Sequence, residues 1–299
     1  MKNDKQVYII LVSYRNADLT IECVRSILSC NDPSIHIVIV DNNSPDDTFV
    51  TLKKELSGIH NVKLILSKAN NGFSAGNNIG IKYSLKQGAD YVMLLNNDTV
   101  IDPDMIDILK NKCDRYTVAS PKMYYYDSPQ RIWFAGGKYL KKSGRYIHIG
   151  ENQMDSPEHS KSIRCDFLTG CCMMISSQTI RDVGLLSEEY FMYIEDIDYS
   201  LRLKKNHVRM IMIPDAKLWH KIGASSGNRS KLSLYYGNRN RLYLNKKFHK
   251  SFYIKTVTVF SRILLALKGS VKNTDEKIIW LSLLDYLKGN MGKRILSDK

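Results

Sequence analysis

Three acidic side chains late in the chain form a cluster that could do acid–base chemistry. Glu195, Asp196 and Asp198 directly follow the apolar stretch 191–193. A carboxyl group beside apolar and like-charged neighbours holds its proton more tightly, which suits a general base. In a helix, positions 195 and 198 share a face and Asp198 also faces Arg202, whereas Asp196 points elsewhere. The cluster therefore offers a candidate general base, and Asp198 a structural ion-pair partner for Arg202. The alternative is a solvated acidic helix start that the helix dipole stabilises.

A second cluster, Asn96-Asn97-Asp98, directly follows the apolar residues 91–95. A carboxylate flanked by amides suits a hard cation such as Mg²⁺ or Mn²⁺, which prefers oxygen ligands and uses phosphate oxygens to complete its shell. His220 becomes a candidate ligand only if the fold brings it near Asp98. The alternatives are a turn, which Asn and Asp both favour, and a structural histidine.

Two earlier segments have the residue types of a nucleotide site. Asp41 follows the four apolar residues 37–40, where a carboxylate can bind a ribose or the imide N–H of uracil or thymine; the alternative is a helix cap or turn. Gly72, Gly76 and Gly80 are four residues apart. A loop-to-helix junction there could offer N–H groups to phosphate, or the glycines could let the helix pack closely. The spacing is neither a dinucleotide fingerprint nor a P-loop.

Tyr235-Tyr236-Gly237-Asn238-Arg239-Asn240-Arg241 combines aromatic and basic residues. Two arginines two positions apart diverge on a helix, so one could meet a diphosphate or acceptor while the other packs outward. Aromatic–basic mixing also occurs in nucleic-acid-binding proteins, but no known nucleic-acid module is present.

The elements that position these groups alternate between strand and helix patterns over the first 120 residues. Strands are predicted at residues 7–12, 36–40, 62–66 and 91–95, and helices at 17–29, after Ser44 as a cap, and at 75–85. This order implies a parallel sheet, in which ligands bind at the carboxyl ends of the strands. Three polar clusters fall there: residues 13–16, 41–44 and 96–98.

The second half of the chain has a different pattern. Residues 122–150 read as irregular structure or short strands, 195–205 as a helix, and 208–213 as a strand that stops at Pro214. From Lys231 onward the chain reads as helical and basic. We expect a catalytic domain over 1–248, with a nucleotide-binding half (1–120) and an acceptor half (121–248), and a basic amphipathic extension over 249–299.

The composition indicates anionic ligands and a reducing compartment. Among the 299 residues, 44 Lys and Arg against 30 Asp and Glu give a formal charge of +14, which attracts nucleic acid, anionic lipid or phosphorylated small molecules. The six cysteines form no C-x-x-C pair, as expected for a cytoplasmic protein. No apolar run reaches the roughly 18 residues of a membrane span.

Taken in order, these segments resemble the family 2 glycosyltransferases, in particular their bacterial rhamnosyltransferase-like branch. The resemblance runs from Val7 to about Phe248 and includes V-S-Y-R-N, V-D-N-N-S, N-G-F-S-A-G-N-N-I-G, L-L-N-N-D-T, F-L-T-G-C-C-M-M-I, F-M-Y-I-E-D-I-D-Y-S-L-R, W-H-K-I-G-A-S-S and Y-Y-G-N-R-N-R. It implies a GT-A fold: a Rossmann-like α/β domain whose mostly parallel sheet is flanked by helices, here with a C-terminal helical extension.

The resemblance also implies roles for individual residues. Asp41 would bind the nucleobase, and Asp98 would be the metal-binding aspartate of a D-x-D-like motif in which Asn96 replaces the first carboxylate. Asp196 would be the base, and His220 a second ligand or a diphosphate contact. The further nucleotide-binding candidates are Ser13, Tyr14, Asn16, Asn43, Asn71, Gly72, Asn77 and Asn97. Glu195 would support the catalytic site, and the diphosphate or acceptor candidates are Trp219, Arg239 and Arg241.

The implied reaction is a single displacement that inverts the sugar. Mg²⁺ or Mn²⁺ would neutralise charge on the leaving nucleoside diphosphate, while Asp196 takes the proton of the acceptor hydroxyl. Unlike a glycosidase, the enzyme needs no second carboxylate to protonate the leaving group. The branch suggests dTDP-rhamnose as donor, with UDP-linked glucose, galactose, galactofuranose or N-acetylhexosamine behind it. The acceptor would be a saccharide or lipid-linked oligosaccharide in cell-surface polysaccharide synthesis.

The C-terminal extension has two open interpretations. Residues 252–267 and 277–287 are apolar and basic, which fits an amphipathic element on the anionic inner leaflet of the cell membrane. Alternatively, the apolar residues pack on the catalytic domain or form a dimer; these are Phe252, Ile263, Leu264, Leu283 and Leu284.

Two other protein classes explain less of the sequence. A nucleotidyltransferase needs a glycine-rich basic loop after the first strand, and residues 13–16 contain no glycine. A non-catalytic protein that binds nucleic acid or lipid is supported only by the net charge. Its anion-binding groove would not gather the carboxylates Asp41, Asp98, Glu195 and Asp196.

Overall fold

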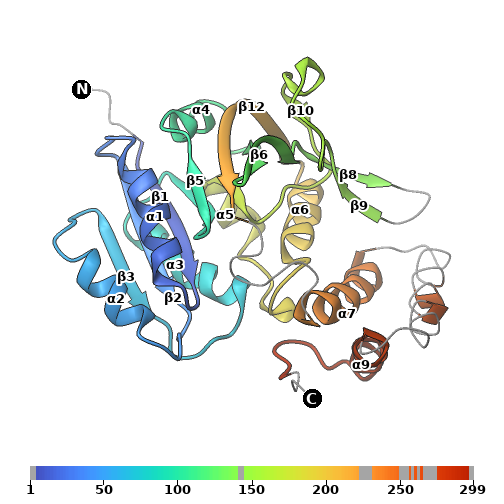
Figure 1. The fold of residues 1–299 in the computed structure, drawn as a ribbon. Helices are drawn as coiled ribbons and strands as arrows, with labels where there is room; N and C mark the ends of the chain where they lie inside the picture. Colours follow the sequence, from blue (N-terminus) through green and yellow to red (C-terminus); the bar gives the residue numbers. More distant parts are fainter. Residues whose placement is uncertain are drawn as a thin grey trace.

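A computed structural model describes residues 5–140, 145–221, 231–248 and 275–295, together with 256, 259–260 and 263–264 (Figure 1). Its centre is a ten-stranded sheet whose main path is β10-β12-β6-β11-β4-β1-β2-β3. Within the described residues, no helix is long and apolar enough to cross a membrane.

The sheet is mostly parallel, as the sequence predicted. Strands β1 (Val7–Ser13), β2 (Ile35–Asp41), β3 (Val62–Leu66) and β4 (Tyr91–Asn96) pair in parallel. Strand β11 (Cys172–Ser176) is antiparallel to both β4 and β6 (Thr117–Tyr125), and β12 (Arg209–His220) is parallel to β6. Strands β6 and β12 therefore run in the same direction as β1 to β4, and β11 is a reversed strand inserted between the two groups.

The remaining strands extend the sheet or form a separate hairpin. Strands β5 (Thr99–Ile101) and β10 (Ile163–Arg164) pair with β12, and β7 (Ser128–Phe134) pairs with β6. The hairpin consists of β8 (Gly137–Leu140) and β9 (Arg145–His148). The helices are α1 (Ala17–Leu28), α2 (Thr48–Glu55), α3 (Phe73–Lys86), α4 (Met105–Lys110), α5 (Ser177–Val183), α6 (Glu195–Lys205), α7 (Lys231–Phe248) and α9 (Asp275–Lys288), with short turns η1 (Pro157–His159) and η2 (Glu188–Tyr190).

Two predicted boundaries are wrong. The strand expected to stop at Pro214 continues to His220, because its register on β6 shifts between Ile213 and Lys217. Such a bulge lets a strand accommodate a residue without an N–H. Ser44 does not cap α2, which begins at Thr48 after Asp47. The hydroxyl of Ser44 donates to Asp41 instead.

Glycines set the distance between α3 and β1. A Cβ built on Gly76 would lie 2.7 Å from Cγ1 of Val12, and one on Gly80 would lie 2.5 Å from Cγ2 of Ile10. Both values are well inside van der Waals contact. The geometry therefore supports close helix packing as the reason for these two glycines.

Gly80→Ala is expected to lower the free energy of unfolding by about 1–3 kcal/mol, because the added methyl group overpacks the contact with Ile10. Gly237→Ala on α7 is the matched control, since nothing lies within 4 Å of its Cβ position. That control should be neutral or stabilising by up to about 1 kcal/mol. Urea denaturation measures both. Equal stability of the two variants would contradict the packing argument.

Helices α7 and α9 lie side by side at the end of the molecule opposite β3 (Figure 1). In α9, Leu283 is buried, whereas Leu284 is 47% exposed. Ile263 is half-buried, Leu264 is exposed, and Phe252 lies outside the described residues. Packing on the protein thus accounts for Leu283 and not for Leu284.

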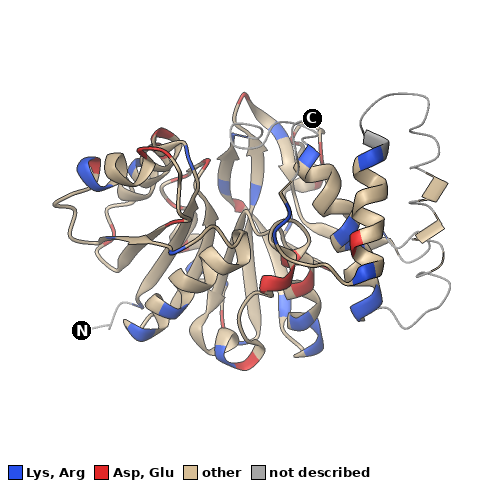
Figure 2. Ribbon diagram, turned by 90° about the horizontal axis from the view of Figure 1, so that it is seen from below, with Lys and Arg blue, Asp and Glu red and all other residues tan. Residues whose placement is uncertain are grey.

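Basic residues are not confined to one face of the chain. Lys and Arg occur on helices at both ends of the sheet (Figure 2). Examples are the last turns of α2, α6 and α7. The described residues therefore distribute their positive charge over separate elements.

Candidate active site

The carboxyl ends of three neighbouring strands bring the polar clusters together. In the sheet register, Ser13 at the end of β1 lies beside Asp41 at the end of β2, and Val12 lies beside Asn96 at the end of β4. The prediction that these clusters share one edge of the sheet is confirmed. The candidate site is built on this edge of the sheet.

Asp41 connects the two loops that follow β1 and β2. Its Oδ1 accepts from the Ser44 N–H (2.9 Å) and its Oδ2 from the Ser44 hydroxyl (2.7 Å). The same hydroxyl accepts from the N–H of Arg15 (2.9 Å). Asp41 is fully buried, whereas Tyr14, Asn16 and Asn43 around it are exposed. Asp41 therefore holds the conformation of the two loops, and the side chains exposed to solvent there are those of Tyr14, Asn16 and Asn43.

Ser13 and Asn97 are joined through Thr20 of α1. The Asn97 amide donates to the Thr20 hydroxyl (2.8 Å), which donates to the Ser13 hydroxyl (3.1 Å). This chain of hydrogen bonds ties the ends of β1 and β4 to α1. Sequence reasoning missed Thr20, because a threonine at a helical position gives no signal of such a bridge.

The backbone of residue 191 packs against the glycine-rich loop before α3. The N–H of Phe73 donates to the Phe191 carbonyl (2.7 Å), and the N–H of Gly72 donates to Asn70 (3.1 Å). A Cβ on Gly72, whose φ is +92°, would lie 1.9 Å from the Phe191 oxygen. Asn77 is buried and donates to the Phe73 carbonyl. Of the predicted nucleotide-binding residues Asn71, Gly72 and Asn77, only Asn71 is exposed. The Phe73 N–H is thus bonded to residue 191 and the Gly72 N–H to Asn70, so both N–H groups are already used within the protein.

Asp98 and His220 meet, as a shared metal site requires. Oδ1 of Asp98 lies 3.0 Å from Nε2 of His220, and both side chains are buried. Among the described residues, no group of three His, Cys, Asp or Glu side chains gathers into a metal site. One carboxylate and one imidazole nevertheless fit Mn²⁺ or Mg²⁺ when phosphate oxygens complete the shell. Asn96 begins this turn two residues before Asp98.

Trp219 does not share the surroundings of His220. Its indole N–H donates to the Pro129 carbonyl (3.2 Å), and its ring stacks on Tyr124. Adjacent residues of a strand point to opposite faces, which separates Trp219 from its neighbour. The structure gives this side chain a packing role.

The two carboxyl groups at the start of α6, those of Glu195 and Asp196, have different surroundings. Oδ2 of Asp196 accepts from the Gly170 N–H (3.0 Å), and Oδ1 accepts from the Ile197 N–H (2.8 Å). Burial raises the pKa of Asp196, and these two donors oppose the rise. Burial, and then the charge of Asp196, raise the pKa of Glu195 to about 8. Two backbone N–H donors therefore favour the charged form of Asp196.

Backbone and ring contacts connect this carboxylate to the strand edge. The N–H of Asn96 donates to the Cys171 carbonyl (2.8 Å), which places the Gly170 turn next to the end of β4. Trp133 packs edge-on against both His220 (4.5 Å between centroids) and His148 (5.1 Å). Burial lowers the pKa of His148, while the charges of Glu151 and then Asp196 raise it.

His148 thus lies in the electrostatic surroundings of Asp196. Sequence patterns did not single out His148, because residues 122–150 show no clear periodicity.

These geometric features coincide with a sequence match. The family described as "Glycosyl transferase family 2" matches residues 8–184. The chain belongs to glycosyl transferase family 2.

Relatives and a solved structure agree with this membership. The chain is 26% identical over 256 residues to the dTDP-rhamnosyl transferase RfbF of Shigella flexneri, with 82% of each chain covered. It is 25% identical over 264 residues to the rhamnosyltransferase WbbL of Escherichia coli (strain K12), covering 82% of this chain and 97% of that one.

The mannosyltransferase PcManGT from Pyrobaculum calidifontis, solved in complex with GDP-Man and Mn²⁺, superposes with a TM-score of 0.60. The two are 11% identical, and the match covers 97% of this chain and 88% of that one. The protein is a glycosyltransferase of the rhamnosyltransferase-like kind with a GT-A fold, as the sequence predicted.

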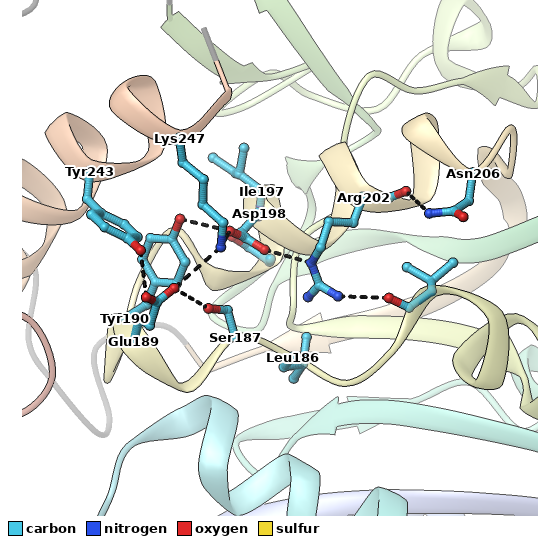
Figure 3. Close-up of polar contacts among 12 residues, drawn as sticks. Leu186, Ser187, Glu189, Tyr190, Ile197, Asp198, Arg202, Asn206, Tyr243 and Lys247 are labelled. Carbon is cyan, nitrogen blue, oxygen red and sulfur yellow. Dashed lines mark hydrogen bonds and ion pairs between the residues drawn. The ribbon is translucent and has the colours of Figure 1, made fainter.

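In this transferase, Asp198 serves the structure. Its two oxygens meet Nε of Arg202 (2.8 Å), Nζ of Lys247 (2.8 Å) and the Tyr190 hydroxyl (2.9 Å), as Figure 3 shows. The predicted pairing with Arg202 is confirmed. Lys247 belongs to α7, so its ion pair with Asp198 also connects α7 to α6.

The two arginines of α7 diverge, as expected, but the roles differ from those predicted. Arg239 is 1% exposed, and its guanidinium donates to Asn240, to the Tyr235 hydroxyl, and to the carbonyls of Asn290 and Gly292. These buried contacts with the protein itself give Arg239 a structural role. Arg241 is half-buried beside the β8–β9 hairpin, where burial and then the charge of Arg145 lower its pKa.

Glu195→Gln is expected to change the pH dependence of stability of the transferase. The folded-state pKa of Glu195 (about 8) exceeds the ordinary 4.5, so its contribution is fully present below pH 4.5 and is lost as pH rises towards 8. The wild-type protein should therefore lose on the order of 2–4 kcal/mol relative to Glu195→Gln across this range. Thermal melts of both proteins from pH 4.5 to 9 measure the difference. Parallel curves would show that Glu195 ionises as an exposed carboxyl group does.

Proposed function

We propose that this glycosyltransferase moves rhamnose from dTDP-rhamnose to an acceptor hydroxyl with inversion at the anomeric carbon. Two relatives are named as rhamnosyltransferases, one of them as a dTDP-rhamnosyl transferase. The observation that carries the proposed mechanism is the fixed Asp196 carboxylate, held by the Gly170 N–H next to the end of β4.

The reaction follows from one charged carboxylate. Asp196 accepts the proton of the acceptor hydroxyl while the hydroxyl oxygen attacks the anomeric carbon from the face opposite the leaving group. The bond from that carbon to the diphosphate oxygen breaks, and the nucleoside diphosphate takes the electron pair. Glu195 holds its own proton at neutral pH, so it does not compete as a base. A single displacement of this kind inverts the sugar.

The donor nucleotide is proposed to lie along the strand-end edge. The exposed Tyr14, Asn16 and Asn43 surround Asp41, whose hydrogen bonds to Ser44 fix both loops. Asn71 borders the same edge from the loop before α3. Ser13, Asn77 and Asn97 act as internal supports of this surface. A thymine or uracil base would contact these loops.

A divalent cation is proposed at Asp98 and His220, where it would supply positive charge beside the departing diphosphate. Solved structures with the same fold were determined with Mn²⁺. Asn96 would contribute its amide oxygen in place of the absent carboxylate. The half-buried Arg241 is the proposed contact for an acceptor or diphosphate, since burial leaves its charge incompletely solvated.

Asp98→Ala is expected to remove the Mn²⁺-dependent part of the stabilisation by dTDP and to leave the Mn²⁺-independent part. A ligand that binds only the folded protein raises the melting temperature according to its concentration and affinity. Thermal melts with dTDP, with and without Mn²⁺, measure this, and EDTA should reverse the gain in the wild-type protein. If Mn²⁺ adds nothing to the dTDP effect in the wild-type protein, the metal assignment fails.

The acceptor side is proposed to involve residues 121–248 and the C-terminal extension 249–299. Exposed apolar side chains occur in this extension at Phe260, Leu264, Leu284 and Leu287. Together with the basic residues of the segment, they favour peripheral attachment to an anionic membrane, where a lipid-linked saccharide would be presented.

The proposed donor is tested with a panel of nucleotide sugars. We expect faster turnover with dTDP-rhamnose than with the UDP-linked glucose, galactose, galactofuranose or N-acetylhexosamine. NMR of the product with a matched acceptor should show the anomeric configuration opposite to that of the donor. A preference for a UDP sugar would replace the donor assignment, and a retained configuration would overturn the mechanism.

A further inference from the structure

The segment directly before the acidic pair has an unusual backbone. Phe191, Tyr193 and Ile194 have φ values of 59°, 66° and 76°. Non-glycine residues seldom adopt positive φ, because this backbone conformation is strained, and they keep it only where the surrounding structure enforces it. Because Glu195 and Asp196 follow at once, the shape of this segment sets where α6 begins and where the Asp196 carboxylate lies.

One side chain from α7 holds most of this segment. The amide nitrogen of Asn240 lies within 2.8–2.9 Å of three carbonyl oxygens, those of Tyr190, Met192 and Tyr193. The carbonyl of Phe191 accepts from the N–H of Phe73 instead. Four consecutive carbonyls are thus held, three of them by one fully buried amide.

The Asn240 amide is itself oriented. Its Oδ1 accepts from Nε of Arg239 (3.1 Å), which fixes which end of the amide faces the carbonyls. Arg239 in turn donates to the carbonyls of Asn290 (3.3 Å) and Gly292 (2.9 Å) after α9. The N–H of Gly292 returns to the Glu189 carbonyl (3.0 Å). The hydrogen bonds thus lead from Asn240 through Arg239 to residues 290 and 292, and from Gly292 back to Glu189, next to the segment 190–194.

From these contacts we propose that Asn240 is a positioning residue for Asp196, and that Arg239 sets its orientation by anchoring it to residues 290–292. The proposal rests on the proposed function, in which Asp196 is the base. Without the amide donors, the strained segment relaxes towards ordinary φ values and the carboxylate shifts relative to the acceptor. Asn240 makes none of the hydrogen bonds that hold the strand-end edge, and the Phe191 carbonyl keeps its own bond to the Phe73 N–H, so the loss is expected mainly in turnover rather than in donor binding.

Kinetics of Asn240→Ala test this, with Asn238→Ala as the matched control. Asn238 is also a buried asparagine of α7, but its amide donates to Leu234 of its own helix. We expect kcat to fall about 10- to 100-fold in Asn240→Ala, as displacement of a reacting group by about 1 Å does. KM for the donor and the melting shift with dTDP should stay within about twofold. Asn238→Ala should keep kcat within about threefold.

Two further variants separate donation from packing. Asn240→Asp keeps the shape but places an acceptor against three carbonyls, so it should lose at least as much kcat as alanine. A role in packing alone predicts that Asn240→Asp is the milder change. Asn240→Ser retains one donor, so its loss of kcat should be intermediate. If the alanine variant does not fold, Asn240→Ser is measured in its place. Arg239→Lys should act in the same direction with a smaller loss.

Hydrogen exchange of the segment 188–198 supplies a readout that does not depend on catalysis. Exchange there should accelerate in Asn240→Ala and not in Asn238→Ala. Unchanged exchange together with wild-type kcat would overturn the proposal, as would equal effects of the two alanine variants. If Asp196→Asn retains full turnover while exchange responds to Asn240→Ala, the base assignment fails and the structural link stands.

Discussion

Replacing Asp196 by Asn is expected to lower the turnover number for sugar transfer about 10²- to 10⁴-fold, the usual contribution of a positioned general base. The amide keeps the shape of the side chain and can still accept from the Gly170 N–H, but it cannot take up a proton from the acceptor. Donor binding should persist, because the strand-end edge is unchanged. Initial-rate kinetics with saturating donor and acceptor measure the loss.

The control for Asp196→Asn is Asp215→Asn on β12, an exposed position where the same chemical change should leave turnover at the wild-type level. The melting shift with dTDP should be equal in all three proteins. Turnover of Asp196→Asn within threefold of wild type, under conditions where chemistry limits the rate, would falsify the assignment of Asp196 as base.

Asp198→Ala is expected to lower the free energy of unfolding by about 3–5 kcal/mol, the cost of breaking a buried ion pair from one side. The carboxylate is fully buried, and its removal leaves Arg202, Lys247 and the Tyr190 hydroxyl without their shared partner (Figure 3). At this chain length the loss corresponds to a drop of roughly 10 °C in melting temperature. Thermal and urea unfolding measure it.

Glu189→Ala is the matched control for this loss. Glu189 also pairs with Lys247 (3.4 Å), but its side chain is 49% exposed and therefore screened by solvent. Exposed ion pairs contribute about 0–1 kcal/mol, so this variant should unfold close to the wild-type temperature. Equal losses in the two variants would mean that burial of Asp198 does not set its contribution.

The sequence predicted the edge of the sheet that carries the site better than the contacts made across it. Apolar runs that end in Asp or Asn predicted the strand ends, and the register placed Ser13 beside Asp41 as expected. Such patterns are local, because one strand and its end lie within a few residues. Family resemblance then supplied roles that local patterns leave open.

Contacts between distant parts of the chain could not be predicted in this way. His220 reaches Asp98 only because β12 continues past Pro214 through a shift in register, which no local rule specifies. In the aromatic–basic motif of α7, Arg239 was predicted to be functional because of its charge. The neighbouring Asn240 instead makes the contacts to the carbonyls of residues 190, 192 and 193. Those contacts span about 50 residues of sequence, and the pairing depends on the packed fold.

The reversed direction of β11 separates two parts of the protein that can change independently. Because β11 is antiparallel to β4, its first residue lies beside the last residues of β4. The chain therefore reaches the strand-end edge through the loop before β11, and this loop brings Gly170 to Asp196. Substitutions or insertions between β6 and this loop would alter the proposed acceptor-facing surface without changing the sequences of β1, β2 or β4. We expect acceptor range to diverge faster than nucleotide recognition among proteins that share this arrangement.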